Sequence, residues 1–240
     1  MSLFDLTGRV ALVTGGARGL GEASSRTLAR LGAVIVLSDI DAEAASATAD
    51  RLANETGAQV LARGCDVTDP DDVDRLVSGL IEELGRLDIL VNNAGIHRRV
   101  DPLDYDPDDV EAILAVNFRG AFQVAARVGR EMTRLGGGSI VNISALGGGI
   151  SGLGRAGSVY CMTKGGLVSL TRELAAEWGS SGVRVNALAP GWIRTPMTEA
   201  LQNNSERSAR VMARVPLGRW GEADDVAGAV AFLASDASAY

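Results

Sequence analysis

The sequence predicts a single α/β domain, in which a doubly wound parallel sheet carries helices on both faces in three α/β/α layers. Short aliphatic runs alternate with longer amphipathic stretches along all 240 residues. Several of the short runs are apolar throughout, as strands buried on both faces require. Glycine occurs 30 times and aromatic residues form only 4% of the chain, so we expect an aliphatic core and many tight turns. We find no repeat, low-complexity stretch or linker, and therefore expect residues 1–240 to form one domain.

Six expected strands alternate with helices in chain order, which implies right-handed βαβ units and a parallel sheet. Each expected strand is a run rich in Val, Ile or Leu, and each expected helix is a longer amphipathic stretch. The acidic runs 69–74 and 104–109 indicate helix starts, because carboxylates are favourable at a helix N-terminus. The expected strands are 9–13, 34–38, 59–62, 89–91, 139–143 and 184–188. The expected helices are 20–31, 42–55, 71–84, 108–135, 158–178 and 223–235.

Residues 194–217 interrupt this alternation with a polar segment after the last expected strand. An insertion at the C-terminal end of a strand lies beside the edge where such sheets bind ligands. We therefore expect this segment to act as a lid over a ligand.

Charge and cysteine usage exclude several classes of protein. The net charge of −7 argues against nucleic acid as a partner, because binding phosphates requires clustered Lys and Arg. The two cysteines are far apart and lack metal-ligand spacing, which favours reduced thiols over a disulfide. The sequence contains neither a signal-like N-terminus nor a long apolar run, so we expect no membrane span and a cytoplasmic location.

A glycine-rich run, TGGARGLG, follows the first expected strand. It places Gly15, Gly19 and Gly21 where a tight turn enters a helix, with Arg18 and Leu20 between them. Backbone N–H groups and the helix dipole would face a pyrophosphate there, and a side chain would hold the phosphates away. A glycine-rich turn without a ligand is the alternative.

The end of the second expected strand indicates which dinucleotide would bind. Asp39 lies 18 residues beyond Gly21, where a carboxylate accepts both ribose hydroxyls and repels the 2′-phosphate of NADP. A helix N-cap is its alternative role. Arg18 could instead attract that phosphate, but Ile40 and Asp41 follow Asp39, so the sequence favours NAD over NADP.

Two further segments follow the third and fourth expected strands. Asp66 and Val67 are placed to contact an adenine edge. The run NNAG brings Asn93, Ala94 and Gly95 against a ribose. Either segment alone could be an Asx turn.

A candidate catalytic group lies in the second half of the chain. Tyr160 and Lys164 are four residues apart, on one face of an expected helix. A free phenol has a pKa of about 10, and we expect the ammonium to lower it towards the range of a useful base. Ser144 ends the fifth expected strand and is suited to orient a substrate oxygen. Asn117, inside the long expected helix, is suited to hold a water that relays protons to Lys164, although an exposed helix Asn and a structural Tyr–Lys pair are the alternatives.

The sequence resembles the short-chain dehydrogenase/reductase family, which has a Rossmann-like fold. The features that carry the resemblance are, in chain order, TGGARGLG, Asp39, Asp66, NNAG, Asn117, Ser144, YCMTK and PGWIRTPM. The resemblance covers the whole chain. It implies a tetrad of Asn117, Ser144, Tyr160 and Lys164, with Lys164 also bonding the nicotinamide ribose. It further implies that the nicotinamide end is held by Pro190, Gly191, Ile193 and Thr195.

The resemblance also implies assembly and metal content. We expect a homo-oligomer, a dimer or tetramer, and no metal, since the single His97 has no partner with ligand spacing. Family members usually continue to a further C-terminal strand, which is absent from this sequence.

The run GIHRRVDPL and the segment ERSARVMARVPLGRWGEADDV resemble the sugar-acid members, the gluconate and 2-keto-3-deoxygluconate dehydrogenases. Arg98 and Arg99 would hold a substrate carboxylate, and Arg155 is a third candidate. Solvent exposure or a subunit contact is the alternative for these arginines.

We therefore expect hydride transfer between NAD(H) and a secondary alcohol or ketone, with a sugar acid as the small-molecule substrate. A 3-oxoacyl-acyl-carrier-protein reductase is the first alternative, and because such enzymes prefer NADP, Asp39 counts against it. A non-catalytic binding protein of the same fold is the second, although all four tetrad positions are filled.

Overall fold

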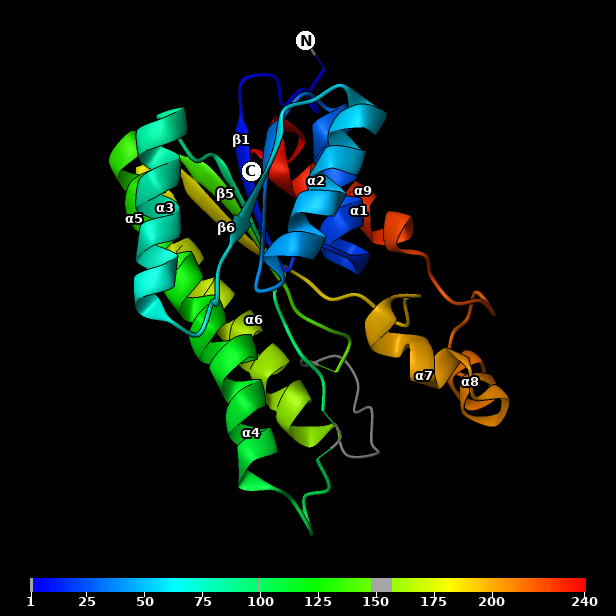
Figure 1. Cartoon of the computed structure of the whole chain (residues 1–240). Helices are drawn as coiled ribbons and strands as arrows, with labels where there is room; N and C mark the ends of the chain where they lie inside the picture. The colour runs from blue at the N-terminus through cyan, green and yellow to red at the C-terminus, as the bar shows by residue number, and fades with distance from the viewer. Residues whose placement is uncertain (1, 99, 148–156) are drawn as a thin grey trace.

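The computed structural model describes residues 2–98, 100–147 and 157–240. Within them, six parallel strands form one sheet in the order β3-β2-β1-β4-β5-β6 (Figure 1). The order reverses direction between β1 and β4, and such a switch point opens a crevice at the C-terminal edge of the sheet. The expected fold class is confirmed. The strands are β1 Val10–Thr14, β2 Val34–Asp39, β3 Val60–Gly64, β4 Ile89–Asn92, β5 Gly138–Ile143 and β6 Val183–Leu188.

Helices cover both faces of this sheet (Figure 1). Alternate residues of one strand point to opposite faces, so Val10 and Leu12 pack towards α3, α5 and α6, while Ala11 and Val13 pack towards α1, α2 and α9. All four side chains are buried. The helices are α1 Gly19–Arg30, α2 Ala42–Thr56, α3 Pro70–Leu84, α4 Pro107–Leu114, α5 Ala121–Leu135, α6 Ser158–Trp178, α7 Glu199–Gln202, α8 Ser205–Met212 and α9 Ala223–Ala234.

The acidic runs begin helices, as their pattern predicts. The Asp69 carboxylate accepts a hydrogen bond from Asp71 N at the start of α3, and Asp106 does the same for Asp108 N at the start of α4. These bonds satisfy backbone donors that a helix start leaves unpaired.

The long helix expected over 108–135 is wrong in one respect. A π-helical segment, Ala115–Gly120, separates α4 from α5. Asn117 lies in this segment, and its side chain donates to Ile96 O and accepts from Ile96 N, both at 2.8 Å. Wider helical turns of this kind often mark functional sites. The backbone of Ile96 therefore forms hydrogen bonds with Asn117, a residue that the helical pattern alone predicts to be an ordinary helix position.

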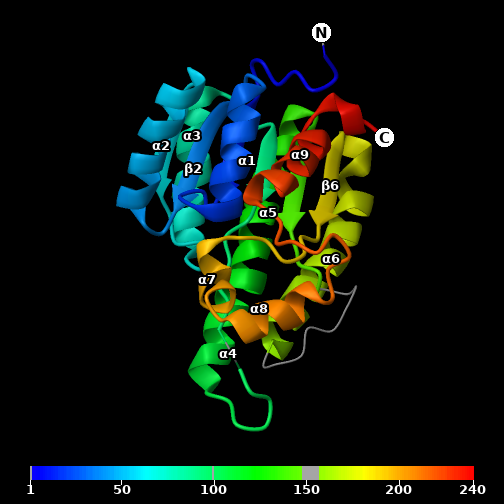
Figure 2. The same cartoon turned by 90° about the vertical axis from the view of Figure 1, so that its right-hand side faces the viewer.

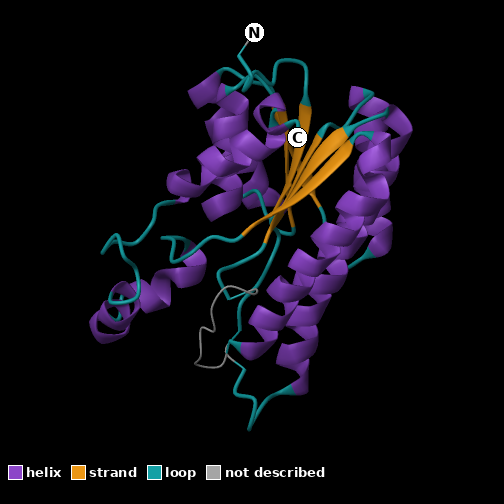
Figure 3. Cartoon of the chain, turned by 180° about the vertical axis from the view of Figure 1, so that it is seen from behind, coloured by secondary structure: helices purple, strands orange, loops and turns teal. Residues whose placement is uncertain are grey.

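The segment expected to act as a lid forms α7 and α8, beyond the C-terminal ends of the strands (Figures 2 and 3). Its two ends meet where Arg194 N donates to Gly221 O at 2.8 Å and Gly221 N donates to Trp192 O at 2.9 Å. The buried Trp220 ring donates to Ser208 Oγ of α8 at 2.9 Å. The backbone hydrogen bonds of Gly221 and the indole hydrogen bond of Trp220 thus attach α8 to the rest of the domain.

Among the described residues, none of the helices combines the length and the apolar character that crossing a membrane requires.

Candidate active site

The glycine-rich turn between β1 and α1 is bonded to the segment that follows β4. Thr14 Oγ1 accepts from the backbone N–H groups of Asn93 and Ala94, at 3.0 and 3.1 Å. In return, Asn93 Nδ2 donates to the carbonyls of Thr14 and Gly15, at 3.0 and 2.9 Å. Two of the expected cofactor segments therefore form one rigid wall at the switch point of the sheet.

This turn accepts only glycine at its key positions. Gly15 and Gly19 both have φ +60, a conformation that L side chains rarely adopt. A Cβ on Gly21 would lie 2.2 Å from Gly15 O. No side chain caps the N-terminus of α1 at Arg18, so the first-turn N–H groups stay available to an anion. The turn therefore fits the pyrophosphate of a dinucleotide.

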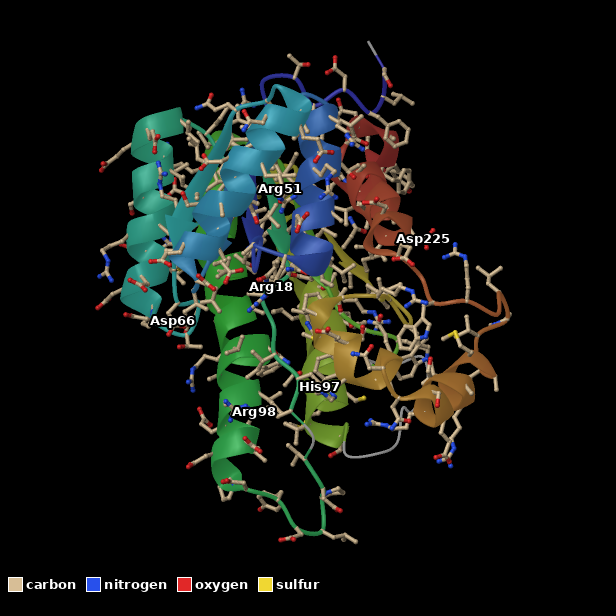
Figure 4. The ribbon with its side chains drawn as sticks, turned by 45° about the vertical axis from the view of Figure 1, so that its right-hand side comes forward. Arg18, Arg51, Asp66, His97, Arg98 and Asp225 are labelled. Carbon is tan, nitrogen blue, oxygen red and sulfur yellow. The ribbon has the colours of Figure 1, made fainter. Side chains whose placement is uncertain are left out.

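Asp39 ends β2 beside this turn, and its side chain is buried. Its carboxylate accepts from Ala17 N and from Asp41 N, both at 3.2 Å. The alternative role as the cap of α2 is wrong, because Asp41 caps that helix by accepting from Ala44 N. Arg18, labelled in Figure 4 at the start of α1, lines the same cleft, so a carboxylate and a guanidinium both border the expected ribose position.

Asp66 forms the Asx turn that was the alternative to its expected adenine contact. Its Oδ1 accepts from Thr68 N and from Thr68 Oγ1, each at 2.8 Å, which is an Asx turn. Asp66 and Val67 nevertheless line the same cleft as Asp39. The turn thus fixes the backbone that the expected adenine contact would use.

A cleft of about 340 Å³ joins the expected cofactor residues. Gly21 packs beneath the turn without lining the cleft, and the remaining members border it. The expected cofactor and catalytic residues on its wall are Gly15, Arg18, Gly19, Leu20, Asp39, Asp66, Val67, Asn93, Ala94, Gly95, Ser144, Tyr160, Lys164, Pro190, Gly191, Ile193 and Thr195.

Tyr160, Lys164 and Ser144 meet at the inner end of this cleft. The Lys164 ammonium lies 5.8 Å from the centre of the Tyr160 ring and donates to Ile143 O at 2.7 Å. Ser144 Oγ donates to Lys164 O at 2.8 Å. These two bonds run in opposite directions between the end of β5 and the second turn of α6, so the strand and the helix hold each other's functional side chains.

The expectation that Lys164 lowers the pKa of Tyr160 is wrong for the protein alone. Burial raises the pKa of Tyr160 to about 12, and the neighbouring Cys161 adds to the increase. Burial also lowers the pKa of Lys164 to about 8. The desolvation of both groups outweighs their attraction, because the ammonium is directed at the Ile143 carbonyl rather than at the phenol oxygen.

Asn117 lies behind the cleft wall and is fully buried, so the exposed-helix alternative is wrong. Both polar atoms of its side chain bond the backbone of Ile96. The relay of protons to Lys164 through a water held by Asn117 stays a prediction. A Cβ on Gly95 would lie 3.3 Å from Asn117 Oδ1 and 3.5 Å from Lys164 Nζ. The backbone at Gly95 thus lies close to both Asn117 and Lys164, and the hydrogen bonds of Asn117 to Ile96 hold this backbone in place.

A second cavity, of about 400 Å³, adjoins the cleft and shares Tyr160 with it. His97 lines this cavity, with its ring edge-on to Tyr160 at 5.0 Å between centroids. Helices α7 and α8 form the opposite wall, including Arg207 and Arg210, which sequence reasoning did not select. The sequence indicates them only through their spacing of three residues, which places both side chains on one face of α8.

Of the expected substrate arginines, the one that the structure describes, Arg98, does not line this cavity. Arg98 is half-exposed and pairs with Asp109 Oδ1 at 2.6 Å, on the α4 side of the molecule and away from α8 (Figure 4). The two neighbours differ: His97 lines the cavity, whereas Arg98 pairs with Asp109 outside it. Arg99 and Arg155 lie outside the described residues. Among those described, no group of three or more His, Cys, Asp or Glu could hold a metal.

The sheet is doubly wound, and its glycine-only turn shares one cleft with the half-buried Tyr160 and the buried Lys164. This combination defines a dinucleotide-dependent oxidoreductase. Residues 15–240 match a family model described as Enoyl-(Acyl carrier protein) reductase. The chain belongs to the short-chain dehydrogenase/reductase family.

Curated relatives of similar identity differ in their reactions. The chain is 38% identical to a gluconate 5-dehydrogenase of Gluconobacter oxydans, over 99% of this chain and 92% of the relative. It is 37% identical to a 3-oxoacyl-acyl-carrier-protein reductase of Thermotoga maritima, over 98% and 94%. A galactitol 2-dehydrogenase (L-tagatose-forming) of Cereibacter sphaeroides is 41% identical, over 100% and 92%.

Among solved structures, a gluconate 5-dehydrogenase of Burkholderia cenocepacia in complex with NADP and tartrate superposes with a TM-score of 0.94. It is 38% identical, over 98% of this chain and 91% of that chain.

Proposed function

We propose that this protein transfers a hydride between NAD(H) and a secondary alcohol or ketone, and that its substrate is a sugar acid. One observation carries this proposal. Tyr160 borders both the cleft that fits a dinucleotide and the second cavity, so a substrate in that cavity would meet the cofactor at the phenol. The expected lid segment, 194–217, supplies the outer wall of the second cavity through α7 and α8.

The side chains at this junction divide the proton chemistry. A bound nicotinamide dinucleotide supplies hydride transfer at the substrate carbon. Tyr160 gives a proton to the substrate oxygen during reduction and removes it during oxidation. Ser144 donates its own proton to Lys164 O, so it has lone pairs left to accept a bond from a substrate hydroxyl. Lys164, held by Ile143 O, keeps a positive charge close to the ring of Tyr160 and so opposes the effect of burial.

For Asn117 we propose a positioning role. Its side chain forms two hydrogen bonds with the backbone of Ile96 and thereby positions the cleft wall next to Lys164.

We propose NAD as the preferred cofactor. Asp39 presents a buried carboxylate at the expected ribose position, where it opposes a 2′-phosphate. NADP is the alternative, supported by Arg18 in the same cleft and by the NADP complex of the Burkholderia cenocepacia relative.

For the substrate, we infer a sugar acid over an acyl-carrier-protein thioester. The gluconate relatives and the run GIHRRV support this choice, although the overall identities, 38% and 37%, do not separate the two classes. Asp39 counts against the reductase, which we expect to prefer NADP. A non-catalytic binding protein is disfavoured because Ser144, Tyr160 and Lys164 converge on one cleft. Assembly as a dimer or tetramer and a cytoplasmic location stay predictions.

Replacing Tyr160 with Phe tests this proposal. Removing one hydroxyl eliminates the proposed acid/base, so kcat should fall by about 10²- to 10⁴-fold. NADH affinity, measured by fluorescence titration, should be almost unchanged. The rates should be measured with NAD and NADP against aldonates, keto-deoxygluconates, simple secondary alcohols and acetoacetyl thioesters.

Tyr105→Phe is the matched control, because Tyr105 is exposed and lines neither cavity. This variant should keep the wild-type rate. A Tyr160→Phe enzyme that also keeps its rate would remove Tyr160 from the mechanism.

A further inference from the structure

The second cavity has a strongly one-sided charge. Its described lining includes Arg207, Arg210 and Arg214, together with apolar and small residues, and no Asp or Glu. The chain as a whole carries the opposite sign, with 30 acidic against 23 basic residues. A pocket of this kind selects for an anion.

The arginines come from one face of α8 and the residues just beyond it. Positions 207, 210 and 214 are separated by three and four residues, which places them along one side of a helix. Val211, between them, is buried, and Ser208 accepts the Trp220 hydrogen bond that attaches α8 to the domain. The arginine face is therefore held towards the cavity by packing.

Arg207 differs from Arg210 in its surroundings. Arg207 is half-buried, and its guanidinium has no ion-pair partner within residues 2–98, 100–147 and 157–240. Arg210 is exposed and pairs with Glu206, one turn earlier on α8. A guanidinium that is partly desolvated and lacks a carboxylate of its own gains most from a carboxylate on a ligand.

Tyr160 and His97 lie on the opposite wall of the same cavity. A molecule that fills about 400 Å³ would touch both walls. Its reacting hydroxyl would lie at Tyr160, and any acidic group at its other end would lie at α8. A hydroxy acid with several carbons between these two groups has this arrangement.

We propose that Arg207, with Arg210 beside it, binds the substrate carboxylate and thereby determines specificity for acids over neutral polyols. This inference rests on the proposed oxidoreductase function and assigns its substrate-binding group. It replaces the role expected of Arg98, whose guanidinium is paired with Asp109 outside the cavity. Arginine is the appropriate side chain because its planar fork matches a carboxylate with two parallel hydrogen bonds.

Steady-state kinetics on two substrates of equal chain length test the assignment. D-gluconate and D-glucitol differ in that one end of the chain is a carboxylate or a neutral alcohol. Arg207→Met should raise KM for gluconate about 10- to 100-fold, the value of a charge-assisted hydrogen bond, with little change in kcat. KM for glucitol should be unchanged, and Arg207→Lys should restore part of the loss. Arg210→Met should produce a smaller increase, because Glu206 already engages that side chain.

Arg134→Met is the matched control. Arg134 and Arg210 are equally exposed, at 58%, and each pairs with a Glu on its own helix, but Arg134 lies at the end of α5 and lines neither pocket. It should leave both KM values unchanged. An Arg207→Met enzyme with wild-type KM for gluconate overturns the assignment and leaves the proposed function intact. Preference for a phosphorylated polyol over gluconate overturns the choice of a carboxylate.

A binding measurement decides the assignment even if neither substrate turns over. Trp192 lines the cavity, so its fluorescence reports on occupancy in the NAD-loaded protein. Wild type should bind gluconate at least about tenfold more tightly than glucitol, and Arg207→Met should remove that difference. Equal binding of the two compounds by wild type overturns the inference. Absent turnover with selective binding contradicts the proposed function while supporting the anion site.

Discussion

Lys164 is the single lysine of the chain, and its ammonium is buried between β5 and α6. Its hydrogen bond to Ile143 O satisfies one donor. Among the described residues that line the cleft, the only carboxylates are Asp39 and Asp66, at the expected adenine end. Burial without a paired anion disfavours the charged form, which is why the pKa of Lys164 falls to about 8. The protein thus keeps a proton-exchanging amine close to neutral pH beside Tyr160.

The pKa of Lys164 should be measurable directly. With lysine labelled at the ε-carbon, the side-chain NMR spectrum contains one lysine signal, because the sequence has one lysine. Its titration should give a pKa of about 8 in the folded protein, against the ordinary 10.5. A folded-state pKa at the ordinary value would contradict the burial argument.

The same shift changes stability in a definite direction. Between the folded pKa of about 8 and the ordinary 10.5, the unfolded chain binds a proton that the folded chain has lost. The contribution of Lys164 to the free energy of unfolding therefore rises with pH across this window, and below it the full penalty is present. Relative to Lys164→Met, wild type should gain roughly 2 to 3 kcal/mol between pH 7 and pH 10.

Residue-level prediction from sequence worked where local geometry determines the role. Gly15, Gly19 and Asp39 follow from strand ends and turn chemistry, and all three border the cleft. The pKa of Tyr160 depends on desolvation, and the direction of Arg98 depends on its ion pair with Asp109, neither of which residue spacing encodes.

At the scale of elements, a buried polar chain connects two strands to two helices. Asn92 Nδ2, at the end of β4, donates to Asn142 Oδ1 of β5 at 3.0 Å and to Ala121 O at the start of α5 at 2.8 Å. Asn142 Nδ2 donates to Thr171 Oγ1 of α6 at 2.9 Å, and Thr171 donates to Leu167 O. This buried network fixes α5 and α6 against β4 and against β5, the strand that Ser144 follows.

Asn142→Ala should therefore destabilise the fold. The substitution leaves one Asn92 N–H without its acceptor in a dry interior, and it opens a small cavity, so the free energy of unfolding should fall by about 2 to 3 kcal/mol. Urea denaturation followed by circular dichroism measures the change. Asn54→Ala is the control: Asn54 is exposed on α2, and alanine favours a helix, so stability should hold or rise slightly. Equal effects of the two substitutions would show that the network contributes nothing.

The hydrophobic pattern predicts the regular strands and helices correctly, but it does not predict the π-helical segment that separates α4 from α5. Strand and helix positions follow from hydrophobic period, within one or two residues at most ends. The π-helical segment Ala115–Gly120 lies within a continuous helical pattern, and Asn117 in it bonds Ile96, 21 residues away, which a local pattern does not encode. The spacing of the arginines along α8 is visible in the sequence. That they face the cavity depends on the hydrogen bond from Trp220 that attaches α8 to the domain, which the sequence does not predict.

At the scale of the whole molecule, the sequence predicts a parallel sheet covered on both faces but not its strand order. Alternation of strands and helices is a local pattern, whereas the neighbours of β1, namely β2 and β4, are set by how the helices pack. The switch point between β1 and β4 is the feature that brings the glycine-rich turn, Asp39 and Tyr160 to one edge.

Because the cofactor cleft draws on β1, β2, β4, β5 and α6, binding should stabilise the domain as a unit. NADH at about 100 times its Kd adds roughly 2.7 kcal/mol, which in a chain of this size raises Tm by about 5 to 10 °C. NADPH at the same concentration should raise Tm less, because Asp39 opposes its 2′-phosphate. Asp39→Asn removes that charge at constant size, so the NADH shift should fall and the NADPH shift should rise. Asp41→Asn, at the α2 cap where Asn also caps well, should change neither shift. A wild-type protein stabilised more by NADPH than by NADH would show that Arg18, rather than Asp39, governs the choice of cofactor.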